Sequence, residues 1–357
     1  MTASSRTTAV LGFGRFGRAL SELLLDAGGR VRAFDPRVEI PASMRADSLR
    51  SLVQGATEVV LAVPVGSIGE AARSLRPHLD PGHLVLDVAS VKHGPVRELA
   101  ETLGRDVPWV ATHPLFGPTS IALGERPLVA VVCPNPLHPG AASRARSFFT
   151  ALGCEVVEED ADGHDRAMAS THALAFFVAK GLIDIRAGED ASFVPPSFRA
   201  MERMIGAVRS DASHLFATIQ KDNPFAAEAR ARLLGALEAI DRDLTSVTGE
   251  GSPPAERISM APLTERAPDL RETRELIDDL DRELVQLLGR RAQFSRRAGR
   301  AKANLGRGVV DSGREEQVIA ARRRWAEEEG LDADGVAEIF RSVLRFSRAV
   351  QKEPQSR

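Results

Sequence analysis

The chain has 357 residues, of which 43% are hydrophobic and 27% are charged, and its formal net charge is −2 at pH 7. A chain of this length and composition is too long for one ordinary domain and suits two or three globular domains. The near-neutral charge argues against a nucleic-acid or membrane partner for the whole molecule.

The two cysteines, Cys133 and Cys154, have neither metal-type nor redox-type spacing. We therefore expect buried thiols, no bound metal and a reducing compartment. The start of the sequence lacks a secretory signal pattern, and no apolar run approaches the roughly 18 residues that a membrane span needs. These features predict a cytoplasmic protein.

The first predicted strand, at residues 8–11, runs into Gly12-Phe13-Gly14-Arg15-Phe16-Gly17 and then into a helical pattern of leucines and alanines. Glycines at these positions between a strand and a helix match a dinucleotide fingerprint. Gly12 would make the tight turn, Gly14 would let the backbone approach a pyrophosphate, and Gly17 would let helix and strand pack closely.

A second strand is predicted at residues 31–34 and is followed by Asp35. A carboxylate at this distance from the fingerprint accepts hydrogen bonds from both ribose hydroxyls of a bound dinucleotide. Asp35 therefore favours NAD over NADP, although Arg37 close by would soften the preference.

Five more apolar strands alternate with helical stretches, at residues 59–63, 84–88, 109–112, 128–132 and 155–157. Their near-continuous Val, Leu and Ala content is typical of strands buried on both faces, which predicts a doubly wound, parallel α/β sheet. Ligands bind beyond the carboxyl ends of the strands in such a sheet. Two polar loops lie there, and their Ser90 and His113 would meet over the cofactor.

His113 follows an apolar run and precedes Pro114-Leu115-Phe116-Gly117-Pro118. Prolines and a glycine in this arrangement predict a rigid turn, which is how a general base is presented. The alternative for a lone histidine is a capped strand end with a solvated imidazole.

From about Asp165 the pattern is wholly helical. Residues 167–178 are apolar nearly all round, which predicts a helix buried inside a domain or a dimer interface. Further helical pattern runs from Phe198 to Leu244, and a stretch rich in glycine and proline follows it. That stretch predicts an exposed linker.

The C-terminal segment is helical again. The apolar face formed by Ile277, Leu280, Leu284 and Leu288 continues into cationic positions at Arg291 and Lys302, which predicts an anionic ligand. The many arginines here would also suit a nucleic-acid helix, but Phe294 is the single aromatic residue among them.

Two shorter helices are predicted after this long one. Ser312-Gly313-Arg314-Glu315 has capping-box spacing and predicts the start of the second helix. Glu315 would then bond the backbone of Ser312, whether or not it also binds a ligand. A third helix at about residues 332–351 carries Ser347 and Gln351 one turn apart.

Residues 8–245 resemble a prephenate dehydrogenase. Besides the nucleotide fingerprint, the resemblance rests on Asp-Val-Ala-Ser-Val-Lys-His-Gly-Pro at 87–95 and on Thr-His-Pro-Leu-Phe-Gly-Pro at 112–118. It implies a Rossmann-type domain, a helical dimerisation domain and an NAD-dependent oxidative decarboxylation of prephenate. His113 would take the proton of the ring hydroxyl, and Ser90 would orient His113 or the nicotinamide.

The helical part departs from this family's pattern. Measured from the pair His164-Asp165, the family's substrate-binding histidine falls at Phe176, whereas His172 lies one turn earlier. The family's carboxylate-binding arginine falls likewise at Ala207, with Arg203 one turn earlier. Two displacements in the same direction suggest that His172 and Arg203 replace the missing pair; the alternative is an altered pocket.

Residues 267–353 resemble an all-helical chorismate mutase, residue by residue. The resemblance implies that Arg291 and Arg314 bind the two substrate carboxylates and that Lys302 and Gln351 donate to the ether oxygen. It places Glu315, with the backbone at Asp311, on the ring hydroxyl. Two further binding positions match, Ser347 and, contributed by a partner subunit, Arg274, which implies a homodimer.

These resemblances predict a dinucleotide-binding domain at 1–162, a helical substrate and dimerisation domain at 163–247, a linker at 248–266 and a mutase domain at 267–357. The implied protein converts chorismate to prephenate and then to 4-hydroxyphenylpyruvate, the tyrosine precursor. Three alternatives stay open: the series from 4-amino-4-deoxychorismate to 4-aminophenylpyruvate, oxidation of arogenate, and a ligand-sensing regulator with one inactive site.

Overall fold

The computed structural model describes residues 7–123, 125–189, 191–210, 213–245, 270–304, 308 and 311–352. The chain divides into two compact units, the first made of residues 1–121 and 127–261 and the second of residues 122–126 and 262–357. The linker predicted at 248–266 lies outside the described residues. Among the helices that are described, none is long and apolar enough to cross a membrane.

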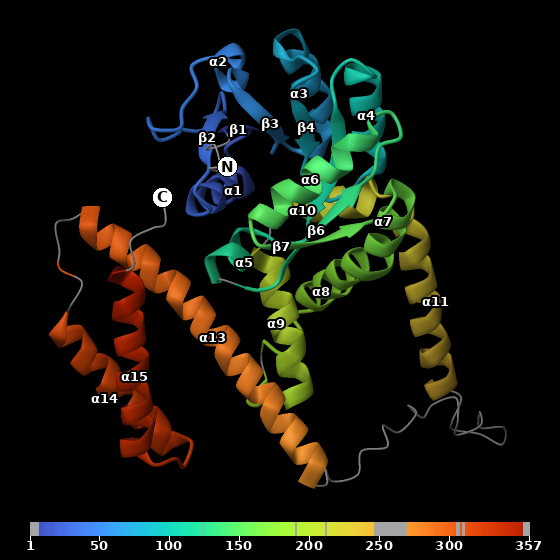
Figure 1. Cartoon of the computed structure of the whole chain (residues 1–357). Helices are drawn as coiled ribbons and strands as arrows, with labels where there is room; N and C mark the ends of the chain where they lie inside the picture. The colour runs from blue at the N-terminus through green and yellow to red at the C-terminus, as the bar shows by residue number, and fades with distance from the viewer. Residues whose placement is uncertain are drawn as a thin grey trace. The chain divides into compact units, whose positions relative to one another are not determined.

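The first unit is built on a seven-stranded sheet whose strand order is β2-β1-β3-β4-β5-β6-β7 (Figure 1). All seven predicted strands are confirmed, with ends that shift by up to three residues. They are β1 (Thr7–Leu11), β2 (Arg30–Phe34), β3 (Ala56–Leu61), β4 (Leu84–Asp87), β5 (Trp109–Pro114), β6 (Leu128–Cys133) and β7 (Cys154–Glu158).

Helices cover both faces of this sheet, as a doubly wound fold requires. Alternate residues of each strand point to opposite faces, so Val10 joins one core cluster and Ala9 and Leu11 join the other. The first cluster lies under α1 (Arg15–Asp26) and α6 (Pro139–Ala151). The second lies under α2 (Leu49–Val53), α3 (Ile68–Leu75) and α4 (His93–Leu103), with short 3-10 turns at η1 (Val65–Ser67) and η2 (Arg76–His78).

The prediction of a wholly parallel sheet is wrong at one position. β1 to β5 are parallel, but β6 runs antiparallel to β5 and parallel to β7. The connection before β6 holds α5 (Pro118–Leu123), whose 6 residues rise about 9 Å, less than the roughly 20 Å that a 6-residue strand spans. Because α5 is too short to return the chain to the amino end of β5, β6 begins near the carboxyl end of β5 and runs antiparallel to it.

Five helices and one π-helical turn follow the sheet in the described part of the first unit. They are α7 (Ala161–Met168), the π turn η3 (Ala169–Ala173), α8 (Leu174–Asp184), α9 (Pro196–Ser210), α10 (Ser213–Lys221) and α11 (Ala226–Thr245). The single helix predicted over 167–178 is therefore interrupted, because η3 shifts the helical register. Its buried face packs Ala173 and Phe176 against Ile219 and Ala226. Ala169 is also buried, while the other residues of that stretch remain partly or fully exposed.

The described part of the second unit contains α13 (Leu270–Asn304), α14 (Ser312–Glu328) and α15 (Ala333–Lys352). α15 packs against both other helices (Figure 1). The core between them is small and consists of side chains such as Ala292, Val318 and Ala337. The apolar face of α13 is not buried within the chain, since Leu280 and Leu284 are 59% and 56% exposed.

The capping box predicted at Ser312 is wrong by one residue. Asp311 is the N-cap of α14, and its side chain accepts the backbone N–H of Arg314 at 3.0 Å. Aspartate is as good an N-cap as serine, so the chain enters the helix one residue earlier. Glu315 pairs instead with Arg348 on α15.

Candidate functional site

The turn after β1 requires glycine at two positions. Gly12 has φ of 98°, and a Cβ there would overlap the backbone carbonyl of Ala62 at the end of β3. A Cβ at Gly17 would overlap the carbonyl of Gly12, so the first turn of α1 lies directly on the strand end. Both observations agree with the roles predicted from the fingerprint.

The N-terminus of α1 is open to a ligand. Its N-cap is Gly14, no side chain caps the helix, and nothing lies within 4 Å of the position that a Cβ at Gly14 would occupy. Asp35, beyond β2, accepts the backbone N–H groups of Phe13 and Arg37, each at 2.8 Å. Uncapped N–H groups, open space and a half-buried carboxylate fit the pyrophosphate and ribose of a dinucleotide.

A buried ion pair joins the carboxyl ends of β4 and β5. The side chains of Lys92 and Asp87 are fully buried and paired, and Lys92 Nζ also donates to the Thr112 carbonyl. Asp87 accepts the backbone N–H of Ala89 at 3.0 Å and that of Thr112 at 3.3 Å. These bonds fix the loop that carries Ser90 against the strand that carries His113.

His113 lies within β5 and is 5% exposed, so neither the predicted turn nor the solvated strand cap is correct. β6 pairs with β5 as far as Pro114, opposite Ala130, and thereby extends the strand past the histidine. The antiparallel β6 therefore places the imidazole inside the unit instead of on a loop.

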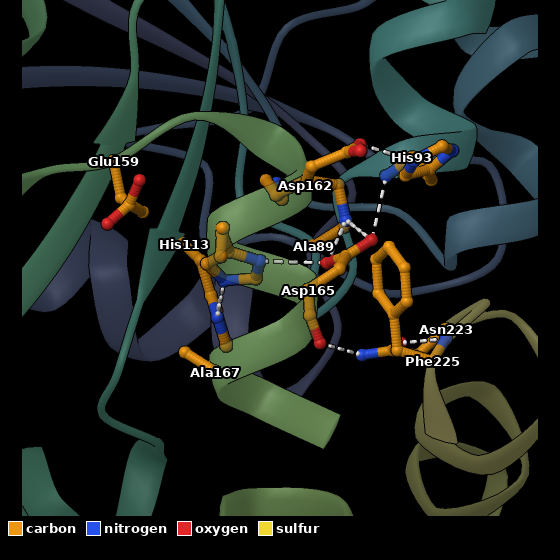
Figure 2. A network of polar contacts seen from close by, with 12 residues as sticks. Ala89, His93, His113, Glu159, Asp162, Asp165, Ala167, Asn223 and Phe225 are labelled. Atoms are coloured by element: carbon orange, nitrogen blue, oxygen red, sulfur yellow. Dashed lines mark hydrogen bonds and ion pairs between the residues drawn. The ribbon is translucent and has the colours of Figure 1, made fainter. Parts of the chain in front are cut away.

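A hydrogen-bonded row of three side chains ends at His113 (Figure 2). His113 Nδ1 lies 2.9 Å from His164 Nε2, and His164 Nδ1 lies 2.8 Å from Asp165 Oδ1. Asp165, which is fully buried, also accepts the backbone N–H groups of Lys92 at 2.9 Å and His93 at 3.0 Å. The carboxylate thus holds α7 against the start of α4.

The network assigns the proton positions of both imidazoles. Because an ionised carboxylate accepts only, His164 Nδ1 carries a hydrogen, and Nε2 of a neutral His164 must accept from His113. His113 is then protonated at Nδ1, which leaves the lone pair of Nε2 available. Burial holds the pKa of His113 well below its usual value near 6.5, and the nearby positive charge of Lys92 lowers it further.

His172 lies within electrostatic range of His113, whereas Phe176 belongs to the helical core. The rings of His172 and Phe176 stack with centroids 4.5 Å apart, and His172 lies in the π turn η3. π turns often mark functional sites, because they re-aim a side chain without ending the helix. The side chains of Arg203 and Ala207 lie outside the described ones.

Ser90 is half-buried, and no hydrogen bond to His113 is found among the described residues. The imidazole is oriented instead by His164. His164 and Lys92 were absent from the predicted site residues, although both belong to quoted motifs: an adjacent His-Asp pair and a lysine following a strand end. No cluster of three or more metal-binding side chains occurs in the part of the chain that is described.

In the second unit, three arginines lie within electrostatic range of one another. Burial lowers the pKa of Arg322, and Arg291 on α13 and Arg314 on α14 lower it further, so the three lie in electrostatic range. The Nε atoms of Arg291 and Arg322 are buried and have no hydrogen-bond partner among the described groups, and the same holds for Oε1 of Gln351. Buried polar atoms of this kind favour a polar, anionic ligand.

The other predicted mutase residues are only partly brought together. Gln351 packs on Gly299, one turn before Lys302 on α13. The Ser347 hydroxyl donates to the Val343 carbonyl of its own helix at 2.9 Å. Asp311 caps α14, and the side chain of Arg274 lies outside the described ones.

A groove of about 610 Å³ lies between α14 and α15, within the size range of ligand pockets. Glu315 lines it, whereas the other predicted mutase residues with described side chains do not. Among the described side chains, this groove therefore does not bring these residues together.

Comparison with known proteins covers both units. Residues 37–131 match the family model for the prephenate dehydrogenase nucleotide-binding domain, and residues 273–352 match that for chorismate mutase type II. A probable arogenate/prephenate dehydrogenase of Methanocaldococcus jannaschii is 26% identical over 203 residues, which are 54% of this chain and 45% of that protein. The chain thus spans less than half the length of this relative.

Two other comparisons extend these matches. An isochorismate pyruvate lyase of Pseudomonas aeruginosa is 38% identical over 82 residues, which are 23% of this chain and 80% of that protein. The crystal structure of prephenate dehydrogenase from A. aeolicus with hydroxyphenyl propionate and NAD+ has a TM-score of 0.55 at 17% identity, covering 69% of this chain and 92% of that one. At this identity the likeness concerns the fold.

A neutral, buried His113 makes the stability of the first unit depend on pH. In the unfolded chain the imidazole takes up a proton as the pH falls through about 6.5, whereas the buried imidazole of the folded chain stays neutral. The free energy of unfolding is therefore highest above that pH and falls as the pH drops below it. We expect His113→Asn to reduce this loss by up to about 1.4 kcal/mol per pH unit.

Urea unfolding between about pH 7 and pH 5 measures this slope. In a Trp325→Phe background, Trp109 is the single remaining tryptophan and reports on β5 itself. Equal slopes for the two proteins would contradict a lowered pKa for His113.

Proposed function

Because the chain carries the prephenate dehydrogenase nucleotide-binding domain and its C-terminal segment belongs to the chorismate mutase type II family, we propose that it is a bifunctional enzyme. It rearranges chorismate to prephenate and then oxidises and decarboxylates prephenate to 4-hydroxyphenylpyruvate. The proposal for the oxidation rests on His113, whose Nε2 lone pair is available and whose ring is oriented by His164 and Asp165. His113 lies at the carboxyl ends of the strands, where the open fingerprint turn also lies.

In the dehydrogenase, a bound nicotinamide dinucleotide supplies the hydride acceptor. His113 Nε2 takes the proton of the ring hydroxyl while hydride leaves the ring carbon that bears this hydroxyl. The ring carboxylate departs as carbon dioxide, its bonding electrons make the ring aromatic, and His113 returns the proton to the ring oxygen of the product. Asp165 stabilises the resulting imidazolium through His164. A lowered pKa keeps His113 neutral, and therefore able to act as a base, at neutral pH.

We assign prephenate, in preference to arogenate, as the substrate of this step, because a mutase on the same chain would release prephenate. His172 and Arg203 are the groups we assign to the substrate in place of the family's pair. The electrostatic effect of His172 on His113 supports this choice.

In the mutase, the rearrangement is pericyclic and needs no nucleophile, so catalysis depends on holding one conformer and stabilising charge. Arg291 and Arg314 bind the two carboxylates, which would satisfy the unpartnered Arg291 Nε. Lys302 and Gln351 donate to the ether oxygen as its bond breaks. Glu315, with the Asp311 backbone, accepts from the ring hydroxyl, and Ser347 lies beside them on α15.

A homodimer would complete the mutase. The exposed face of α13, formed by Ile277, Leu280, Leu284 and Leu288, is the apolar surface that a second copy would cover. α11 has a similar exposed row in the first unit, including Leu237 and Leu244. Arg274 would enter the site from the partner subunit.

The cofactor choice depends on Asp35. We expect kcat/KM for NAD+ to exceed that for NADP+ by at least about tenfold, because the 2′-phosphate on the ribose of NADP+ would bring negative charge against the Asp35 carboxylate. Initial rates of reduced cofactor formation at saturating prephenate measure this ratio. Asp35→Ala should bring the two values together; an unchanged ratio in that variant would contradict the role of Asp35.

The two reactions should be separable by mutation. With chorismate and NAD+, His113→Asn should stop NADH formation and leave chorismate consumption unchanged. Lys302→Ala should lower chorismate consumption by at least about a hundredfold, as loss of an oxyanion donor does, and leave NADH formation from added prephenate unchanged.

Loss of both reactions in either variant would contradict separate sites. Wild-type protein that forms NADH from neither prephenate nor arogenate would contradict the dehydrogenase and favour the regulator. NADH from 4-amino-4-deoxychorismate alone would favour the amino series.

A shared mutase site can be tested by complementation. Arg274→Ala and Arg291→Ala should each abolish chorismate consumption, because each removes one residue from both sites of a dimer. Mixed dimers isolated through two affinity tags contain one intact site of two, so about half of the wild-type activity should return. Arg291→Ala with Lys302→Ala is the matched control, because those residues come from the same subunit and no intact site forms. Activity in the control pair, or none in the first pair, would contradict the shared site.

A further inference from the structure

A cation lies directly against the carboxylate that we assign to the ring substituent of the mutase substrate. Arg348 on α15 donates from Nη1 to both oxygens of Glu315, at 2.7 and 2.6 Å. The two side chains are 32% and 27% exposed, so the pair is partly shielded from water. Arg348 is not among the residues predicted from the sequence.

The surrounding groove contains more positive than negative charge. Its charged lining consists of Glu315, Glu316, Arg323, Arg341, Arg345 and Arg348. Two of these arginines pair with residues that are not in the lining, Arg323 with Asp334 and Arg341 with Glu338. Glu315 is therefore neutralised by its own partner, and Glu316 is the other acid among the described residues that line the groove.

Pairing changes what Glu315 can accept. A lone carboxylate in a partly desolvated site attracts a cation much more strongly than a neutral hydroxyl. Each carboxylate oxygen has further lone pairs beyond the one that Arg348 uses, so the paired group still accepts a hydrogen bond from a hydroxyl. An ammonium group at the same place meets the Arg348 guanidinium as a like charge, which is unfavourable.

The two substrate series differ in this group. Chorismate has a neutral ring hydroxyl, whereas 4-amino-4-deoxychorismate has an amine that is protonated at neutral pH, as aliphatic amines are. We propose that Arg348 is a specificity-determining residue of the mutase site and that, by pairing with Glu315, it selects a ring hydroxyl over a ring ammonium group. This inference rests on the proposed mutase function and on the place assigned to Glu315.

The test compares kcat/KM for consumption of chorismate and of 4-amino-4-deoxychorismate, each followed by chromatography on the full-length protein. Arg348→Met keeps a long side chain and removes the charge, whereas Arg348→Lys keeps the charge. Arg324→Met, an exposed position on α14 outside the groove lining, is the matched control. The ratio of two constants from one preparation does not depend on how much of the protein is folded.

We expect wild-type protein to prefer chorismate by at least about tenfold and Arg348→Met to reduce that preference by at least about tenfold. Arg348→Lys and Arg324→Met should stay within about threefold of the wild-type ratio. Wild-type preference for the amine, or an Arg348→Met ratio within about threefold of wild type, would overturn the inference and leave the mutase proposal standing. Wild-type protein that consumes neither substrate would overturn both.

Discussion

The first candidate site depends on one buried carboxylate, that of Asp165. This carboxylate accepts two backbone N–H groups at the start of α4 and the Nδ1 hydrogen of His164. The backbone carbonyl of Asp165 accepts from the side-chain amide of Asn223 at 2.7 Å. Removing a buried charge from such a set leaves several donors without acceptors and costs about 3–5 kcal/mol. The same group therefore joins the helical part of the unit to the sheet and orients the imidazoles that end at His113.

The sheet brings the polar groups of the candidate site together at the carboxyl ends of its strands. β1 to β5 are parallel, so the fingerprint turn, Asp35, the Lys92 loop and His113 share their carboxyl ends. β6 then reverses direction and keeps His113 inside a strand. His113 is buried there, and burial is the main cause of the lowered pKa of His113.

In the second unit, more apolar surface and more buried polar atoms are left without a partner among the described residues. Its core contains few large side chains, α13 exposes its leucines, and the Nε atoms of Arg291 and Arg322 have no partner among the described groups. Apolar surface and unpaired guanidinium atoms are unfavourable unless something covers or binds them. Both features agree with a unit completed by a second copy and by an anionic ligand. Glu315 and Arg348 differ, because they already neutralise each other.

The sequence alone determined the elements and the chemistry that local pattern encodes. Apolar runs located all seven strands, and the glycine spacing predicted a turn whose Gly12 and Gly17 leave no room for a Cβ. Only the tertiary structure decided what depends on contacts between distant segments. The direction of β6 and the burial of His113 depend on how the strands pair. The row from His113 to Asp165 and the Glu315–Arg348 pair each join residues that lie tens of positions apart in the chain. Periodicity reports which face of an element is apolar, but it does not report which partner that face meets.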